Sequence, residues 1–285
     1  MKTVTPYLKL LRLSDQHVSL GFVIAGAIVA NVTASWLWIW GLACVLLSMV
    51  AYVLNELQDV DTDTHSWNPI HLQSAQRKKI NSSVVVVMVI SLLTISAFLA
   101  GWVGMLGWWV LLLGLAIAYS LPPLRLKGVA GFDILVQVLT ATLIPLLAVL
   151  WKANVSLVSA TALIVILFLM IWSIFYPYQL ADFVADQRAK LGNTHLKLGW
   201  QKTLQLMLIV SVLSVILFPI LFQNQWWSLP FVIFTIHSGY WYWYWLQVTP
   251  QQAMRSMQNY VLKMKPLSHV LLFYLFLLWT LTQFL

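Results

Sequence analysis

Charged residues are scarce in this sequence, and acidic residues are the scarcest of them. Only 8% of the 285 residues are charged, and only eight residues are Asp or Glu. A soluble domain of this length carries roughly a quarter charged residues, so the composition excludes a soluble fold. Cysteine is nearly absent as well, because Cys44 is the only one, and this excludes a disulfide within the chain. The position of Cys44 inside an apolar run predicts a small buried hydrophobe.

Apolar residues dominate instead. They make up 61% of the chain, and the mean hydropathy is +0.85. A helix that spans a membrane needs about 20 mostly apolar residues. Runs of this kind cover approximately residues 16–35, 36–56, 83–101, 103–121, 132–151, 156–178, 203–222, 226–247 and 267–285. The sequence therefore predicts an all-α, polytopic membrane protein of nine transmembrane helices, with residues 1–285 forming a single domain.

The basic residues indicate how these spans are oriented. If the predicted spans alternate in direction, Lys152 is the only basic residue that falls on one face, and the others fall on the opposite face. Cytoplasmic loops of membrane proteins carry the excess of Lys and Arg. We therefore expect the N-terminus and the long basic loops in the cytoplasm and the C-terminus on the other side. The net charge of +8 thus reflects topology and does not indicate nucleic-acid binding.

Two sets of polar residues with the same spacing end two of the apolar runs. The sets are Asn55, Asp59 and Asp63, and Tyr178, Asp182 and Asp186. Side chains four residues apart on a helix lie along one stripe. Carboxylates beside hydrocarbon are costly and mark functional sites. One set alone is typical of a helix end that meets water, but two sets on one face favour a shared cation. Hard carboxylate oxygens suit Mg²⁺.

A third feature is the run Tyr119-Ser-Leu-Pro-Pro-Leu-Arg-Leu-Lys127. Its two prolines end the preceding apolar helix, because proline lacks a backbone donor and has a fixed φ. Arg125 and Lys127 then lie on the same predicted face as the two acidic sets. They are either charges that set topology or ligands for phosphate oxygens, Arg in bidentate fashion and Lys as a point charge.

In this order and on one face, the three motifs resemble the UbiA superfamily of intramembrane prenyltransferases over essentially the whole chain. The resemblance implies a helical bundle around a central cavity that opens to the lipid. It also implies Mg²⁺-dependent transfer of a prenyl group from a prenyl diphosphate to a hydrophobic acceptor, with release of pyrophosphate. Aromatic compounds, quinone precursors and polyisoprenoids such as carotenoids are all possible acceptors. The implied partners are this donor, this acceptor and membrane lipid, and nucleic acid is not among them.

The resemblance also implies a role for each motif residue. The implied Mg²⁺ ligands are Asn55, Asp59 and Asp63 for one ion, and Asp182 and Asp186 for the other. The implied diphosphate ligands are Asn55, Arg125 and Lys127. Tyr119 and Tyr178 would line the site near the reacting carbon.

The chain departs from the family pattern at two places. Many members have an Arg-Pro pair where this chain has Asn68-Pro69. Two explanations stay open: Arg77 or Lys78 replaces the missing arginine, or the donor is held differently. After the second acidic set, the family usually has a glycine and then a basic residue. This chain has the basic residue first, Lys190, and then Gly192. Lys190 is therefore kept as a further candidate for binding the diphosphate, with its role in doubt.

Two other functions are weighed against prenyl transfer. An ion-coupled secondary transporter would carry its carboxylates near the bilayer midplane, beside broken helices. The placement of the carboxylates at span ends, next to basic loops, favours a phosphate-bearing ligand instead. A catalytically inactive family member is the second alternative, and the presence of all four motif aspartates argues against it.

Three histidines, His65, His71 and His195, lie in the two loops that follow the acidic sets. Acid–base catalysis and zinc binding are both conceivable for them. Their spacing matches no metal motif, so they are expected to be solvated loop residues.

Overall fold

The computed structural model describes residues 5–59, 80–221 and 229–281. Three residues proposed above for the site, Asp63, Arg77 and Lys78, lie outside the described residues, and so do His65 and His71.

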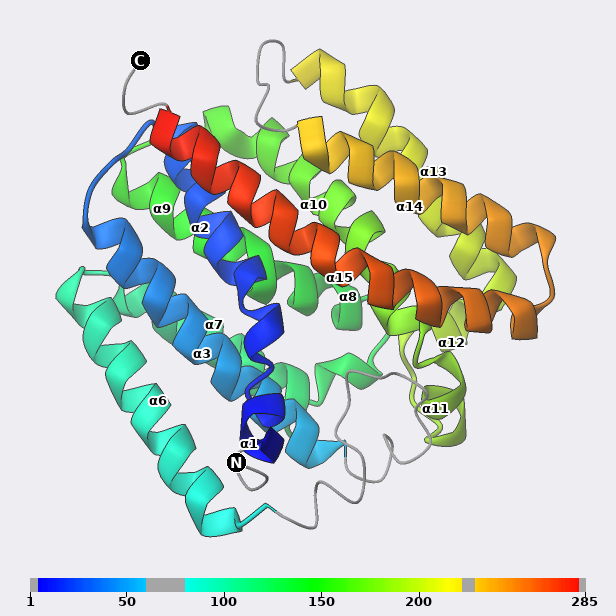
Figure 1. The fold of residues 1–285 in the computed structure, drawn as a ribbon, viewed down its shortest axis with the longest axis horizontal. Helices are drawn as coiled ribbons and strands as arrows, with labels where there is room; N and C mark the ends of the chain where they lie inside the picture. The colour runs from blue at the N-terminus through cyan, green and yellow to red at the C-terminus, as the bar shows by residue number, and fades with distance from the viewer. Residues whose placement is uncertain (1–4, 60–79, 222–228, 282–285) are drawn as a thin grey trace.

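Within the described ranges the regular structure is helical, as predicted, and the helices form one bundle (Figure 1). The longer helices are α2 (His17–Ala30), α3 (Trp36–Gln58), α6 (Ser82–Trp102), α7 (Leu106–Ser120), α8 (Phe132–Val138), α9 (Ile144–Lys152), α10 (Leu157–Leu180), α13 (Trp200–Leu221), α14 (Leu229–Gln247) and α15 (Pro250–Leu281). The shorter elements are α1 (Thr5–Leu10), η1 (Leu13–Asp15), η2 (Leu126–Gly128), η3 (Leu139–Leu143), α11 (Phe183–Arg188) and α12 (Thr194–Leu198).

Several helices have the length and composition of membrane spans. Among the described residues, the segments long and apolar enough to cross a bilayer are Trp36–Gln58, Ser82–Trp102, Phe132–Lys152 and Trp200–Phe218. Shorter apolar helices cover Val18–Ala30, Leu106–Ser120 and Ile164–Leu180. These helices are those of an integral membrane protein, while the count of nine spans stays a prediction.

Helix α6 shows why the bundle suits lipid. Its outward face carries Val87, Phe98 and Trp102, which are 64%, 62% and 71% exposed. A helix that is apolar all round is stable only in an apolar environment. The inward faces of other helices form the core, where the fully buried indole of Trp40 on α3 donates to the carbonyl of Pro145 on α9 at 3.2 Å.

The bundle has two chemically different ends. At one end, the Lys152 ammonium donates to the Val103 carbonyl at 2.6 Å and lies 5.3 Å from the centre of the Trp36 ring. The other end, called the acidic end below, contains the last residues of α3, α7 and α10, the start of α8, and helices α11 and α12. Lys152 therefore lies away from the acidic sets, in agreement with its predicted separation from the other basic residues.

Two helix boundaries differ from the sequence-based prediction. Helix α10 ends at Leu180 and α11 begins at Phe183, so Tyr178, Asp182 and Asp186 do not share one continuous helix. Helix α15 begins at Pro250, well before residue 267, where the last span was predicted to start. The helix continues through Pro266 without a break. It packs along α2, and in Figure 1 it runs diagonally across the bundle.

A proline lies inside α10, about one turn before the helix ends. Pro177 has no backbone N–H, so the Ser173 carbonyl one turn earlier loses its helical donor. The buried hydroxyl of Tyr242, on α14, donates to that carbonyl instead. One turn after Pro177 the chain tightens, and the Asp182 N–H donates to the Gln179 carbonyl at 3.1 Å. The resulting turn points α11 away from the axis of α10.

Candidate active site

A cavity of about 100 Å³ lies at the acidic end of the bundle. Its lining residues are Asn55, Asp59, Tyr119, Lys127, Asp133, Gln179, Asp182, Asp186, Leu191, Asn193 and His195. Every motif aspartate that the structure describes is among them. Residues about 130 positions apart in the sequence thus face one small space, as the duplicated spacing predicted.

The first acidic set keeps the helical geometry expected of it. Asp59 caps α3, and its N–H donates to the Asn55 carbonyl at 3.0 Å, which continues the stripe by one turn. The Lys127 ammonium donates to the side-chain oxygen of Asn55 at 3.2 Å and forms an ion pair with Asp59. A nitrogen of Arg125 lies 3.3 Å from the same Asp59 carboxylate. Two cations therefore contact one buried carboxylate, and both lie on the same face as the acidic sets, as predicted.

The turn after α7 brings these cations to Asp59. The helix ends at Ser120, and the Pro122–Pro123 peptide that follows is cis. The Arg125 N–H then donates to the Leu121 carbonyl at 2.9 Å and closes the turn. Arg125 itself adopts a left-handed backbone, with φ of 36°. Lys127 follows within η2, and its side chain is only 9% exposed.

The second acidic set has different neighbours. Asp186 accepts a hydrogen bond from the side-chain amide of Asn193 at 2.7 Å. The Nε2 atom of His195 lies 3.0 Å from the same carboxylate oxygen. Burial raises the pKa of Asp186, while His195 and Asn193 act in the opposite direction. The upward direction shows that desolvation outweighs these contacts.

The expectation that His195 is a solvated loop residue is wrong. Its side chain is 2% exposed, and its ring centre lies 5.5 Å from that of Phe183. The reason is that residues 194–198 form α12, which turns the imidazole inward against α11. A helix of only five residues has no clear hydrophobic periodicity in the sequence, so this packing was not predicted.

Two further candidates near the second set are Asp182, which is a member of it, and Lys190, which is not. Asp182 stands at the N-cap position of α11 and lines the cavity. Lys190 is exposed, lines neither this cavity nor the one described next, and has a left-handed φ of 54°. That backbone conformation favours glycine, which gives a physical reason for the glycine usual at this position in the family.

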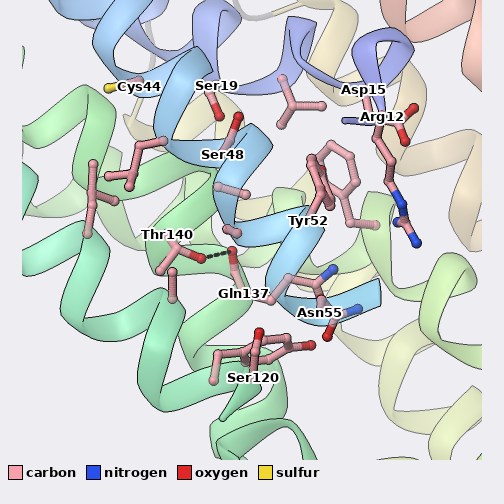
Figure 2. A pocket seen from close by; sticks show the side chains of 18 of the residues that line it. Arg12, Asp15, Ser19, Cys44, Ser48, Tyr52, Asn55, Ser120, Gln137 and Thr140 are labelled. Atoms are coloured by element: carbon pink, nitrogen blue, oxygen red, sulfur yellow. Dashed lines mark hydrogen bonds between the residues drawn. The ribbon is translucent and has the colours of Figure 1, made fainter. Parts of the chain in front are cut away.

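A second, larger cavity of about 280 Å³ adjoins the first (Figure 2). Helix α3 presents Cys44, Ser48, Tyr52 and Asn55 to it along one face. Across the space, α7, α8 and η3 contribute Ser120, Gln137 and Thr140, as the close view shows. The wall also includes Tyr178 and, at the N-terminal side, Arg12 and Asp15. Four residues line both cavities: Asn55, Tyr119, Gln179 and Asp182.

Sequence reasoning missed several of these positions. Asp133, Gln179 and Asn193 were not assigned to the site, and His195 was expected to be solvated. Asp133 offered one usable signal, because a chain with only eight carboxylates has few to spare for solvated positions. Within the described residues, no three side chains among His, Cys, Asp and Glu gather closely enough to hold a metal ion unaided.

Comparison with solved structures identifies relatives with the same fold. A UbiA homologue from Archaeoglobus fulgidus bound to GPP and Mg²⁺ matches with a TM-score of 0.71 and 17% identity, over 96% of this chain and 99% of that one. A structure of such a homologue bound to DMAPP and Mg²⁺ gives 0.70 and 17%, with the same coverage. A digeranylgeranylglyceryl phosphate synthase gives 0.63 and 18%, over 96% and 98% of the two chains.

At these identities the structural matches establish the fold alone. A search of curated proteins finds no match. The family model of the UbiA prenyltransferase family, in contrast, matches residues 19–267, which is most of the chain and includes every motif discussed above. The chain therefore belongs to the UbiA prenyltransferase family.

Proposed function

We propose that this protein transfers a prenyl group from a prenyl diphosphate to a lipophilic acceptor within the membrane, with the help of Mg²⁺, and releases pyrophosphate. The observation that carries the proposal is the convergence of Asp59, Asp182 and Asp186 with Lys127 on one small cavity. That cavity adjoins a larger one, which would take the hydrophobic chain. Solved relatives with this fold bind GPP or DMAPP together with Mg²⁺.

The donor set fits Mg²⁺ bound through a phosphate ligand. Magnesium sites of this kind use only one or two carboxylates per ion and complete their coordination with phosphate oxygens and water. Asn55, Asp59 and Asp63 would hold one ion, and Asp182 and Asp186 the other. When bound, the ions would neutralise charge that develops on the departing pyrophosphate.

The chain's own residues supply the remaining chemistry. Lys127 and Arg125 already lie against Asp59, so they would present positive charge to the diphosphate oxygens where the leaving group forms. Arg77 or Lys78, in the segment between α3 and α6, would add a further cation. Lys190 is not included, because its exposed position supports no contact with either cavity.

The larger cavity would protect the reacting carbon from water. Tyr119 and Tyr178 line it, and aromatic faces stabilise an adjacent cation. Cleavage of the bond between the allylic carbon and the diphosphate oxygen would give an allylic cation and pyrophosphate. An electron-rich carbon of the acceptor would then form a bond to this cation and lose a proton to water. The acceptor is proposed to be an aromatic compound, a quinone precursor or a polyisoprenoid.

The proposed topology places this chemistry at the cytoplasmic face. Nine spans in a single domain of residues 1–285 would put the N-terminus and the acidic end inside and the C-terminus outside. Arg125 and Lys127 lie at the acidic end, whereas Lys152 lies away from it. This distribution supports the orientation, since the excess of basic residues marks the cytoplasmic side.

Turnover by the purified protein tests the proposal. In detergent with Mg²⁺, a panel of labelled prenyl diphosphates and a lipid extract, the wild type should release pyrophosphate and label a lipid. Asp182→Ala should reduce both signals to the level seen with EDTA, while the variant still elutes as a monodisperse species. Wild-type turnover by Asp182→Ala would refute the metal assignment. Ion flux in proteoliposomes, without pyrophosphate release from any donor, would favour the transporter instead.

A further inference from the structure

Two loops meet at the acidic end, behind the wall of the small cavity. One loop carries Arg125 and Lys127, and the other follows Asp186. Val129 and Gly192 form a parallel backbone bridge between them. A Cβ atom on Gly192 would lie 2.9 Å from the Gly128 carbonyl oxygen, too close for any side chain without a shift of the backbone. The bridge therefore requires glycine at position 192, and it fixes the spacing between the cationic loop and the second acidic set.

A buried carboxylate fastens the same junction. The two oxygens of Asp133, which is 2% exposed, accept from the N–H of Thr194 at 2.8 Å and from its hydroxyl at 2.5 Å. The hydroxyl in turn accepts from the Gly131 N–H at 2.7 Å. Hydrogen bonds to a charged acceptor are stronger than neutral ones. Thr194 is thus held through its N–H and its hydroxyl. The set of Gly131, Asp133 and Thr194 is called the clasp below.

The residues on either side of Thr194 are the two that contact Asp186. Asn193 donates to Asp186 at 2.7 Å through Nδ2, and its Oδ1 accepts from the Leu196 N–H at 3.3 Å at the start of α12. These two bonds define which way the amide faces. His195, one residue after Thr194, places Nε2 3.0 Å from the same Asp186 oxygen. A displacement of Thr194 would therefore move both contacts together.

We propose that Asp133 and Thr194 are positioning residues, which orient the Asp186 carboxylate toward the small cavity through Asn193 and His195. The proposal rests on the proposed function, because Asp186 is assigned there to Mg²⁺. Mutation of groups that orient a metal ligand commonly costs about 10–100-fold in metal affinity or activity. The clasp is therefore expected to set how much Mg²⁺ the protein requires.

Thr194→Val tests this role, because valine keeps the shape of threonine and removes the hydroxyl. We expect about a tenfold rise in the Mg²⁺ concentration for half-maximal turnover, with a kcat at saturating Mg²⁺ close to that of the wild type. Stabilisation by Mg²⁺ plus inorganic pyrophosphate, measured as a shift in melting temperature, should shrink in parallel. Thr194→Ser should restore both values, because serine keeps the hydroxyl.

Thr235→Val provides the matched control. Thr235 lies on α14, is fully buried, and donates to the Phe231 carbonyl within its own helix at 2.7 Å. Loss of the Thr235 hydroxyl should lower the melting temperature without changing the Mg²⁺ requirement. If Thr194→Val does not fold, Asp133→Asn decides the question, since the amide oxygen still accepts one bond. It should raise the Mg²⁺ requirement in the same direction but by less.

An unchanged Mg²⁺ requirement in a folded Thr194→Val protein would overturn the positioning role. So would an equal rise in Thr235→Val, because it would show a general effect of lost stability. Failure of the proposed function has a different signature. In that case the wild type itself would show neither turnover nor stabilisation by Mg²⁺ and pyrophosphate.

Discussion

Asp59 and Asp186 belong to two motifs of the same spacing and line the same cavity, yet their surroundings differ in charge. Asp59 contacts two cations, Lys127 and Arg125. Asp186 contacts a neutral amide and the imidazole of His195. The repeated spacing therefore duplicates the position of a carboxylate at the cavity but not its electrostatic environment. A cation that approaches Asp59 competes with Lys127, whereas one that approaches Asp186 mainly meets hydrogen-bonding groups.

This contrast assigns different tasks to the two sets. The first set is joined to the cationic loop, so it is expected to respond to the diphosphate and the metal together. The second set is positioned by neighbours on its own loop, so it is expected to respond mainly to the metal. Substitutions that exchange or remove these partners should separate the two responses.

Lys127→Met should have the largest effect. It leaves the Asp59 carboxylate buried with one cation fewer and removes positive charge from the proposed leaving group. Loss of one preorganised electrostatic contact commonly lowers kcat by about 100-fold or more, and we expect a loss of this size. Removing one partner of a buried ion pair costs about 3–5 kcal/mol, so the melting temperature should fall as well. Pyrophosphate release and thermal denaturation in detergent measure the two effects.

Lys152→Met separates the two causes. It removes another lysine with a defined partner, the Val103 carbonyl, at the opposite end of the bundle. It should lower stability and leave turnover near the wild-type value. Comparable losses of turnover in both variants would show that Lys127 acts through stability, and the contrast between the two acidic sets would then lose its chemical meaning.

His195→Phe should have a smaller effect, confined to the second set. Phenylalanine keeps the aromatic packing against Phe183 but removes the nitrogen 3.0 Å from Asp186. Loss of a group that orients a metal ligand changes metal affinity or activity about tenfold or more, so we expect a tenfold loss of turnover at limiting Mg²⁺. Assays across a range of Mg²⁺ concentrations should show that excess metal recovers most of it.

The control for this change is His237→Phe. His237 lies on α14, and its ring stacks on Tyr260 at 5.6 Å, within an aromatic cluster. It should leave the Mg²⁺ dependence unchanged. If His195→Phe loses turnover equally at all Mg²⁺ concentrations, His195 serves something other than the orientation of Asp186.

The sequence predicted the parts of this site that follow from local spacing. Helix geometry predicted that Asn55 and Asp59 share a stripe, and the alternation of the spans predicted that Lys127 lies on the same face. The contact between Asp186 and His195 was missed because it depends on how α11 and α12 fold back on each other. The break after Leu180 was missed for a similar reason, since a proline inside a membrane helix is often tolerated when neighbouring side chains satisfy the freed carbonyl. Here Tyr242 does so, and the helix still ends one turn later.

Lys190→Gly should have the smallest effect, because Lys190 is exposed and lines neither cavity. A non-glycine residue with left-handed backbone is disfavoured by about 1–2 kcal/mol, while glycine loses about 0.5–1 kcal/mol more through conformational entropy. The net expectation is a gain of up to about 1.5 kcal/mol, seen as a slightly higher melting temperature, with unchanged turnover. Asn154→Gly is the matched control, because Asn154 has a φ of 56° at the opposite end of the bundle. Asparagine tolerates this conformation better than lysine, so its gain should be smaller. A loss of turnover in Lys190→Gly alone would show that Lys190 reaches the diphosphate, and the second acidic set would then have a cation of its own, as the first one does.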